Sequence, residues 1–198
     1  MENKKIMSKI EFIIPTYNRP NQLMGVISSI FSQRSDKWKI HVVADGPYDG
    51  YQKVKDYFSG DERIRFSELE IPGRDWGHTP RNYGLEHATE DWVVMSGDDN
   101  YYTPVFVDHF LNVVKPGVHF VYCDMIHNWV NYEYLHIKSV PKYGSIDIGN
   151  FMAKRVNAQK LRLDVTKEAA DAVFVEQYIK KFNKEGIRYI PKPLYVHN

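Results

Sequence analysis

The chain has 198 residues, a formal net charge of +1 and one cysteine; 43% of its residues are hydrophobic and 26% are charged. This composition is typical of a globular protein of one domain, lacks the basic excess of a nucleic-acid binder, and excludes an internal disulfide or a multi-cysteine zinc site. No run is apolar enough for a membrane span or a signal peptide, so we expect a soluble cytoplasmic protein, either complete or one module of a longer polypeptide.

Short apolar runs alternate with helical patterns through the first part of the chain. Strands are predicted at 10–14, ended by Pro15, and at 39–44, 63–67, 91–96 and 118–123. One helix face is formed by Leu23, Val26, Ile27, Ile30 and Phe31. Thr79-Pro80 and Thr103-Pro104 are typical helix starts, for helices that reach about 88 and 114. This alternation predicts a mainly parallel, doubly wound α/β sheet flanked by helices.

The second part of the chain is less regular. A strand is predicted near 134–138 and a short final strand at 187–190. Between them, a long helix is expected from about Thr166, with Gly186 as its stop signal. The remainder of 124–150 shows no clear period.

Polar residues directly after the predicted strands are the first candidates for a site, because ligands bind beyond the carboxyl ends of such strands. They are Thr16-Tyr17-Asn18-Arg19, Asp45-Gly46, Gly97-Asp98-Asp99-Asn100 and Asp124. In the acidic pair, one carboxylate can accept from a ribose hydroxyl while the other binds Mg²⁺ or Mn²⁺, which prefer oxygen ligands. Asp, Asn and Gly are also turn residues, so the pair alone is equally compatible with a surface turn.

Three motifs occur in a fixed order before and around this pair. They are an apolar strand followed by Pro15-Thr16-Tyr17-Asn18-Arg19-Pro20, the strand end Val42-Val43-Ala44-Asp45-Gly46, and the segment from Pro80-Arg81-Asn82-Tyr83-Gly84 to Ala88. Together they resemble family 2 glycosyltransferases, over about residues 10–115. Two positions depart from the family pattern: Ala44 stands where an Asp is usual, and Gly97 stands where an acidic residue often precedes the pair.

The resemblance implies a GT-A-type fold and an inverting, metal-dependent transferase. Residues 1–115 would form the nucleotide-sugar-binding half of the single domain, and 116–198 a smaller acceptor and catalytic half. The donor would be bound by Pro15, Thr16, Tyr17, Arg19, Asp45, Arg81 and Asp98. Among these, Asp45 would accept from the base, Arg81 would lie under the diphosphate, and Asp98 would face the ribose or sugar. Asp99 would bind Mn²⁺ (or Mg²⁺).

Such a reaction also needs a base that removes the proton of the acceptor hydroxyl, and a carboxylate within hydrogen-bond reach can do this. In the family the base is an Asp or Glu at the head of a late helix. Asp171 matches this position and lies beside the apolar stripe of the predicted helix. Glu176 is the alternative, and each residue alone is also compatible with a solvated helix charge.

His197, near the end of the chain, resembles a C-terminal histidine that several GT-A enzymes use as a metal ligand, and imidazole suits Mn²⁺. An unpaired surface histidine is the alternative interpretation. Other candidates for sugar contacts share a polar and aromatic setting, which is equally compatible with core packing. They are Trp76, His78, Asp124, His127 and Trp129.

The sequence therefore predicts a glycosyltransferase that moves a hexose from a UDP-sugar to a carbohydrate or other hydroxyl acceptor. A sugar-phosphate nucleotidyltransferase is an alternative, although the segment after the first strand lacks the glycine-rich phosphate loop of that class. A non-catalytic nucleotide-sugar-binding module is another, because fold alone does not establish activity. The transferred sugar and the acceptor depend on residues 124–165, where the resemblance is weakest.

Overall fold

The computed structural model describes residues 8–128 and 133–198. Its strands are β1 (Ile10–Thr16), β2 (Trp38–Ala44), β3 (Ile64–Glu68), β4 (Trp92–Met95), β5 (Tyr101–Tyr102), β6 (Phe120–His127), β7 (Leu135–Ile137), β8 (Phe151–Lys154) and β9 (Ile187–His197). Its helices are α1 (Pro20–Phe31), α2 (Gln52–Tyr57), α3 (His78–Glu86), α4 (Phe106–Asn112), α5 (Arg155–Ala158) and α6 (Ala170–Lys181). Two short 3₁₀ turns are η1 (Asp49–Tyr51) and η2 (Lys184–Gly186).

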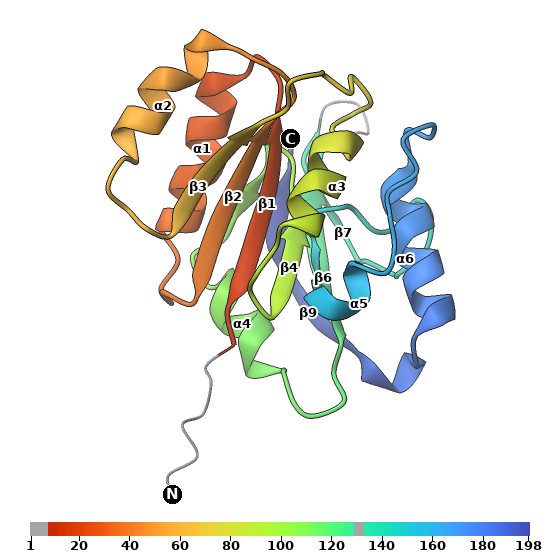
Figure 1. Ribbon diagram of the computed structural model, residues 1–198. Coiled ribbons are helices and arrows are strands. Elements are labelled where there is room, and N and C mark those ends of the chain that lie inside the picture. Colours follow the sequence, from red (N-terminus) through yellow and green to blue (C-terminus); the bar gives the residue numbers. More distant parts are fainter. Residues whose placement is uncertain (1–7, 129–132) are drawn as a thin grey trace, which may run out of the picture.

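The strands form one sheet in the order β3-β2-β1-β4-β8-β6-β9-β5, with β7 paired to β6 (Figure 1). The pairs from β3 to β4 are parallel, as is the pair of β6 and β9. β8 runs antiparallel between β4 and β6, and β5 pairs antiparallel with β9. The prediction of a mainly parallel sheet flanked by helices is therefore confirmed, with antiparallel members in the second half of the chain.

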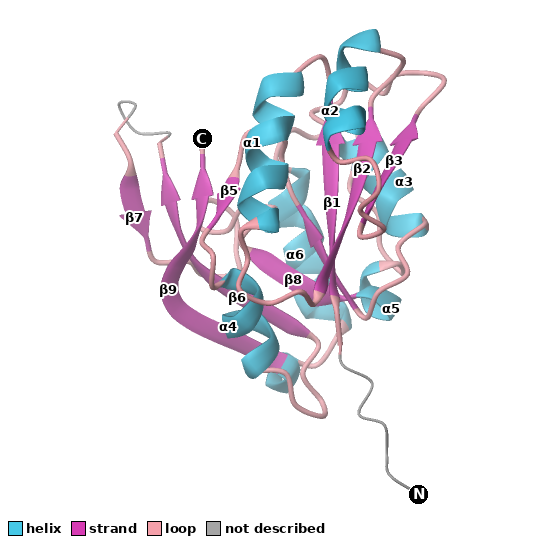
Figure 2. Ribbon diagram, turned by 90° about the vertical axis from the view of Figure 1, so that its left-hand side faces the viewer, coloured by secondary structure: helices cyan, strands magenta, loops and turns pink. Residues whose placement is uncertain are grey.

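Helices cover both faces of the sheet, and β1 supplies side chains to both cores. Phe12 and Ile14 pack in a buried cluster with α1, α2 and α4, whereas Ile13 packs with α3, α5 and α6. The views in Figures 1 and 2 show the two helical layers on opposite sides of the strands. Alternate burial follows from the two-residue period of a strand, and each such side chain contributes about 1.5–3 kcal/mol by leaving water.

Several predicted boundaries move in the structure. β1 continues through Pro15 to Thr16. Its pairing with β4 ends at Ile13, so the N–H that Pro15 lacks is not needed for a hydrogen bond to β4. Helix α3 begins at His78 rather than at Thr79-Pro80. The N-cap residue is Gly77, and the carboxylate of Asp75, two residues earlier, accepts from the Thr79 N–H at 3.1 Å.

The C-terminal elements also differ from the prediction. Helix α6 begins at Ala170, four residues after Thr166, and ends at Lys181 before η2. Strand β9 has 11 residues instead of four, because the pairing with β6 shifts register on both sides of the Asp124–Pro193 pair, and this irregularity accommodates Pro191 and Pro193. The strand predicted near 134–138 is confirmed as β7, whereas β8 and α5 were not predicted.

Within the part of the chain that the structure describes, no helix is both long and apolar enough to cross a membrane. Cys123 lies buried in β6 as a free thiol, which agrees with its interpretation as a small core residue.

Candidate functional site

A cavity of about 570 Å³ opens at the carboxyl ends of β1, β2, β4 and β9. All the predicted donor and metal residues line it: Pro15, Thr16, Tyr17, Arg19, Asp45, Arg81, Asp98, Asp99 and His197. The loop before α3 adds Arg74, Asp75, Trp76 and Gly77 to the lining, α3 adds Pro80, and Gly97 follows β4. Parallel strand order explains the gathering, because the carboxyl ends of neighbouring parallel strands meet at one edge of the sheet.

The two carboxylates after β4 have different surroundings. Asp98 is buried and accepts a 2.8 Å hydrogen bond from Thr16 Oγ1, and its burial raises the pKa of the carboxyl. Asp99 is more open, with 28% of its side chain exposed, and Arg19 Nη1 lies 2.9 Å from Asp99 Oδ2. The same nitrogen is 3.5 Å from Asp98 Oδ1. One carboxylate is thus built into the wall, and the other faces the cavity under an arginine that is itself half exposed.

The carboxylate of Asp45 accepts hydrogen bonds from the backbone of the loop before α3, which forms one side of the cavity. Its Oδ1 accepts from the Gly73 N–H at 2.7 Å and its Oδ2 from the Arg74 N–H at 2.9 Å. Each carboxylate oxygen has a second lone pair, so these bonds leave acceptor capacity toward the cavity. The predicted contact of Asp45 with a nucleotide base is compatible with this arrangement and stays a prediction.

Arg81 lies in the floor of the cavity and is buried. Its Nε donates to the Ser96 carbonyl and its Nη1 to the Trp76 carbonyl, each at 2.8 Å. Burial lowers the pKa of the guanidinium, while the negative charges of Asp147 and Asp171 oppose that effect. The side chain therefore ties β4 to the loop before α3 and places a positive charge among carboxylates.

The two candidate bases lie in different places. Asp171 is in the first turn of α6, where burial and then the charge of Asp147 raise the pKa of its carboxyl to about 6. A pKa near neutrality is the property that suits a general base. Glu176 is exposed, accepts from the Tyr143 N–H at 3.3 Å, and lines a separate depression beside Pro141. Asp171 is not among the residues that line the cavity, although its charge acts on Arg81 in the cavity floor, so its role as the base stays a prediction.

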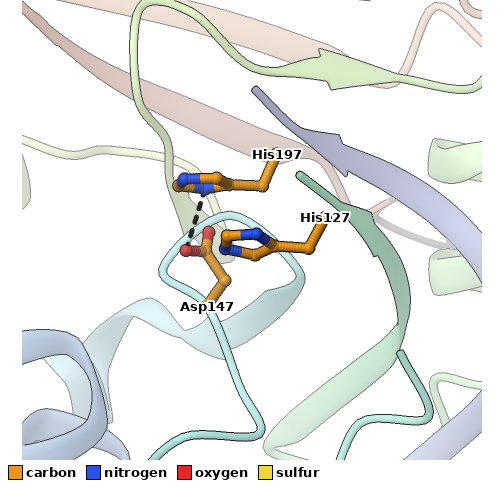
Figure 3. Close-up of side chains that lie close together, drawn as sticks. All are labelled: His127, Asp147 and His197. Atoms are coloured by element: carbon orange, nitrogen blue, oxygen red, sulfur yellow. Dashed lines mark ion pairs between the residues drawn. The ribbon is translucent and has the colours of Figure 1, made fainter. Parts of the chain in front are cut away.

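His197, the last residue of β9, lies beside Asp147 and His127, as Figure 3 shows. His197 Nδ1 is 3.1 Å from Asp147 Oδ2, and the His197 ring stacks on that of His127 with centroids 4.1 Å apart. The two groups are close without forming a hydrogen bond, because His197 Nδ1 is buried and has no hydrogen-bond partner among the described residues. Carboxylate and imidazole donors together suit Mn²⁺. Asp99 and His197, which line the same cavity, therefore fit a divalent cation.

Sequence reasoning missed Asp147. It lies in the segment 124–150, which showed no clear period, and its only local signal is the Asp-x-Gly turn in which the Gly149 N–H donates to Asp147 Oδ1 at 3.0 Å. Its proximity to His197 is a tertiary contact between a loop and the end of β9.

The other candidates divide between the cavity and the protein interior. Trp76 lines the cavity with 59% of the residue exposed. His78 is buried, and its Nε2 lies 3.0 Å from the Lys167 carbonyl oxygen. The buried carboxylate of Asp124 accepts from Tyr189 Oη at 2.7 Å and from the Ser139 N–H at 3.0 Å, so its acceptor capacity is used largely inside the protein. Trp129 lies outside the described residues.

Comparison with curated proteins finds relatives named as glycosyltransferases. An uncharacterized glycosyltransferase of Rickettsia felis is 23% identical over 133 residues, which are 67% of this chain and 21% of that protein. The glycosyltransferase GlyA of Streptococcus pneumoniae is 31% identical over 101 residues, 50% of this chain and 14% of that protein. The chain thus spans about a fifth or less of the length of these relatives.

Solved structures share the fold at low identity. TarS of S. aureus in complex with UDP-GlcNAc has a TM-score of 0.76 at 18% identity, covering 96% of this chain and 58% of that one. The mannosyltransferase PcManGT of Pyrobaculum calidifontis, in complex with GDP-Man and Mn²⁺, has a TM-score of 0.72 at 17% identity, covering 98% and 57%. The family model "Glycosyl transferase family 2" matches residues 11–170, so this chain belongs to glycosyl transferase family 2.

Proposed function

We propose that the chain transfers a hexose from a nucleotide diphosphate sugar, a UDP-sugar, to a hydroxyl acceptor with inversion. The observation that carries the proposal is that one cavity at the sheet edge is lined by Asp98, Asp99 and Arg81. The negative charge of Asp171 also acts on Arg81. Complexes of the similar structures with UDP-GlcNAc and with GDP-Man support a nucleotide-sugar donor. Whether the nucleotide is uridine or guanosine diphosphate has to be tested.

Asp171 is the proposed base. Its carboxylate would take the proton of the acceptor hydroxyl while the acceptor oxygen forms a bond to the anomeric carbon. The bond from that carbon to the diphosphate oxygen breaks on the opposite face, which inverts the configuration. A pKa of about 6 leaves Asp171 mainly ionised at neutral pH and still basic enough to accept a proton.

Asp99 and His197 are the proposed ligands of Mn²⁺ or Mg²⁺, which when bound would neutralise charge on the departing diphosphate. The remaining residues hold and shield the donor. We assign to Asp98, which accepts a hydrogen bond from Thr16, a contact with a ribose or sugar hydroxyl, and to Tyr17 and Asp45 contacts with the nucleotide base; all of them line the cavity. The exposed indole of Trp76 offers an apolar face at the same wall, which is suited to a sugar ring.

A thermal-shift and turnover experiment tests the proposal. The chain is heated with Mn²⁺ and, in turn, UDP, GDP, UDP-GlcNAc, UDP-glucose, UDP-galactose and GDP-mannose, with and without EDTA. We expect uridine nucleotides to raise the Tm, and we expect EDTA to abolish this increase. One of the UDP-sugars should also release UDP slowly. If no nucleotide diphosphate stabilises the chain, the proposal is wrong. Binding without hydrolysis or transfer to any acceptor indicates a binding module instead.

A further inference from the structure

Arg19 connects the start of α1 to the acidic pair after β4. Its Nη1 donates to Asp99 Oδ2 at 2.9 Å and lies 3.5 Å from Asp98 Oδ1. Among the described residues these are the only hydrogen bonds or ion pairs of the Arg19 side chain, and both use the same nitrogen. The guanidinium therefore keeps its Nη2 and Nε donors available, and 53% of the side chain is exposed.

Another arginine of the chain shows how a guanidinium that fixes local structure is bound. Arg63 contacts Asp61 through two nitrogens, with Nε 3.0 Å from Oδ1 and Nη2 2.6 Å from Oδ2. Two-point pairing of this kind is the strong and geometrically specific form of an arginine–carboxylate contact. The contact of Arg19 with Asp99 uses one nitrogen only, so it is the weaker kind.

The backbone of Arg19 is held, whereas its side chain can move. Arg19 is the N-cap residue of α1, and its carbonyl oxygen accepts from the Leu23 N–H at 3.0 Å. Exposed side chains change rotamer within nanoseconds. Rotation about side-chain bonds alone can therefore carry the guanidinium to another partner in the cavity that Arg19 lines, with no change in the helix.

The two carboxylates differ in their other contacts. Asp98 Oδ2 accepts from Thr16 Oγ1 at 2.8 Å, so this side chain has a partner that does not depend on Arg19. Within residues 8–128 and 133–198, Arg19 supplies the only hydrogen bond or ion pair of the Asp99 side chain. Asp99 is thus a carboxylate whose single counter-ion is weakly held.

A guanidinium and a divalent cation compete for the same oxygen of Asp99. Divalent ions such as Mg²⁺ bind carboxylate oxygens at about 2.1 Å, and Arg19 Nη1 already lies 2.9 Å from Oδ2. Two positive charges so close to one oxygen repel each other. A diphosphate in the cavity offers the guanidinium a new partner, because phosphate oxygens match its forked set of donors.

We propose that Arg19 is an exchangeable counter-ion, which neutralises Asp99 in the free chain and moves to the donor diphosphate when the divalent cation binds Asp99. This inference rests on the proposed function, which places the ion on Asp99 and the nucleotide in the cavity. The exchange makes the ion and the nucleotide favour each other's binding beyond their direct contact, and this coupling is reciprocal.

The first measurement is Mn²⁺ binding without nucleotide, followed by electron paramagnetic resonance of the free ion. Arg19→Gln should bind Mn²⁺ about 5-fold more tightly than the wild type, which corresponds to the upper end of the range for an exposed ion pair. Arg74→Gln is the matched control, because Arg74 lines the same cavity but forms no ion pair with Asp99 in the described structure. Its Mn²⁺ affinity should be nearly unchanged.

The second measurement repeats the titration with saturating UDP. UDP should raise the Mn²⁺ affinity of the wild type at least about 10-fold more than that of Arg19→Gln, because the variant lacks the charged donor to the phosphate. If Arg19→Gln binds Mn²⁺ no more tightly than the wild type without UDP, or if UDP has the same effect on both, the inference is overturned and the proposed metal site stands. A wild type that binds Mn²⁺ neither alone nor with UDP refutes the metal part of the proposed function, and the exchange with it.

Crystal structures of the wild type observe the exchange without turnover. In the free protein, Arg19 Nη1 should contact Asp99. In the complex with Mn²⁺ and UDP, the ion should contact Asp99, and a guanidinium nitrogen should lie within about 3.2 Å of a phosphate oxygen. A guanidinium that stays on Asp99 beside the bound ion, or that contacts neither group in the complex, overturns the inference.

Discussion

Replacement of Asp171 by Asn should stabilise the fold while it abolishes transfer. The carboxyl has a pKa of about 6 in the folded chain, against 3.8 for the ordinary group, because burial and the neighbouring charge of Asp147 disfavour its ionised form. A shift of about two pKa units corresponds to roughly 3 kcal/mol. At pH 7.5 this is the cost of holding an ionised Asp171 in the folded protein, and an Asn side chain of the same shape does not incur it.

The sign of the pH dependence follows from linkage. A carboxyl whose folded pKa is raised destabilises the fold progressively as the pH rises from about 4 to about 6, and the full cost remains above that range. For a domain of this size about 3 kcal/mol corresponds to a Tm increase of roughly 6–12 °C. The difference in Tm between Asp171→Asn and the wild type should therefore be large at pH 7.5 and shrink toward zero near pH 4, where Asp171 is protonated.

Activity should change in the opposite direction. Loss of a general base costs about 10²–10⁴-fold in kcat, and wild-type kcat should fall as the pH decreases through about 6. Calorimetry from pH 4 to 8 and UDP-release kinetics on the same two proteins measure both effects. Asp171→Ala serves as a control, since it removes the charge but leaves a cavity. An Asn variant that is no more stable than the wild type at pH 7.5, or that retains activity, would refute the reasoning.

Three further variants test other parts of the site. Arg19→Ala should tighten Mn²⁺ binding in the absence of nucleotide, because the guanidinium 2.9 Å from Asp99 Oδ2 competes with the ion; titration with Mn²⁺ checks this, and weaker binding would contradict it. Gly149→Ala should lower the free energy of unfolding by about 1–3 kcal/mol, measured in urea, because its Cβ would overlap the Tyr195 ring. Arg81→Lys should also destabilise the chain by about 1–3 kcal/mol, since an ammonium cannot reach two carbonyls with the geometry of a guanidinium; an unchanged unfolding midpoint would contradict it.

The sheet could be predicted from the sequence where local patterns and tertiary structure agree. Continuous apolar runs give β1, β2 and β4, because strands buried on both faces need no polar alternation. The length of β9 could not be predicted, because its prolines are accommodated by two register shifts against β6 that the local sequence does not reveal. Helix α6 begins later than predicted, because residues before Ala170 form turns in which the Asp164 carboxylate accepts from the Thr166 N–H.

The candidate site was predictable to the extent that it is built from strand ends. Thr16, Asp45 and Asp98 lie at the carboxyl ends of three adjacent parallel strands, so chain order alone brings them to one edge. The contact of Asp147 with His197 joins a loop to a strand end fifty residues later in the chain, and no spacing rule connects them. The same holds for Arg74 and Trp76, whose place in the cavity wall depends on the hydrogen bonds of Asp45 and Arg81 to their backbone.

Backbone strain in the described residues is concentrated around the cavity. The non-glycine residues with positive φ there are Asn18, at 53°, Arg74, at 51°, and Trp76, at 58°. Asn18 lies between two residues of the cavity wall, and the other two belong to it. A left-handed non-glycine residue costs about 1–3 kcal/mol, and it persists only where its surroundings fix it. Here the buried guanidinium of Arg81 donates to the Trp76 carbonyl, so an interaction in the floor of the cavity holds the strained backbone of its wall. A wall that is rigid before the donor arrives reduces the ordering cost of binding, which is the advantage that such strain can offer a transferase.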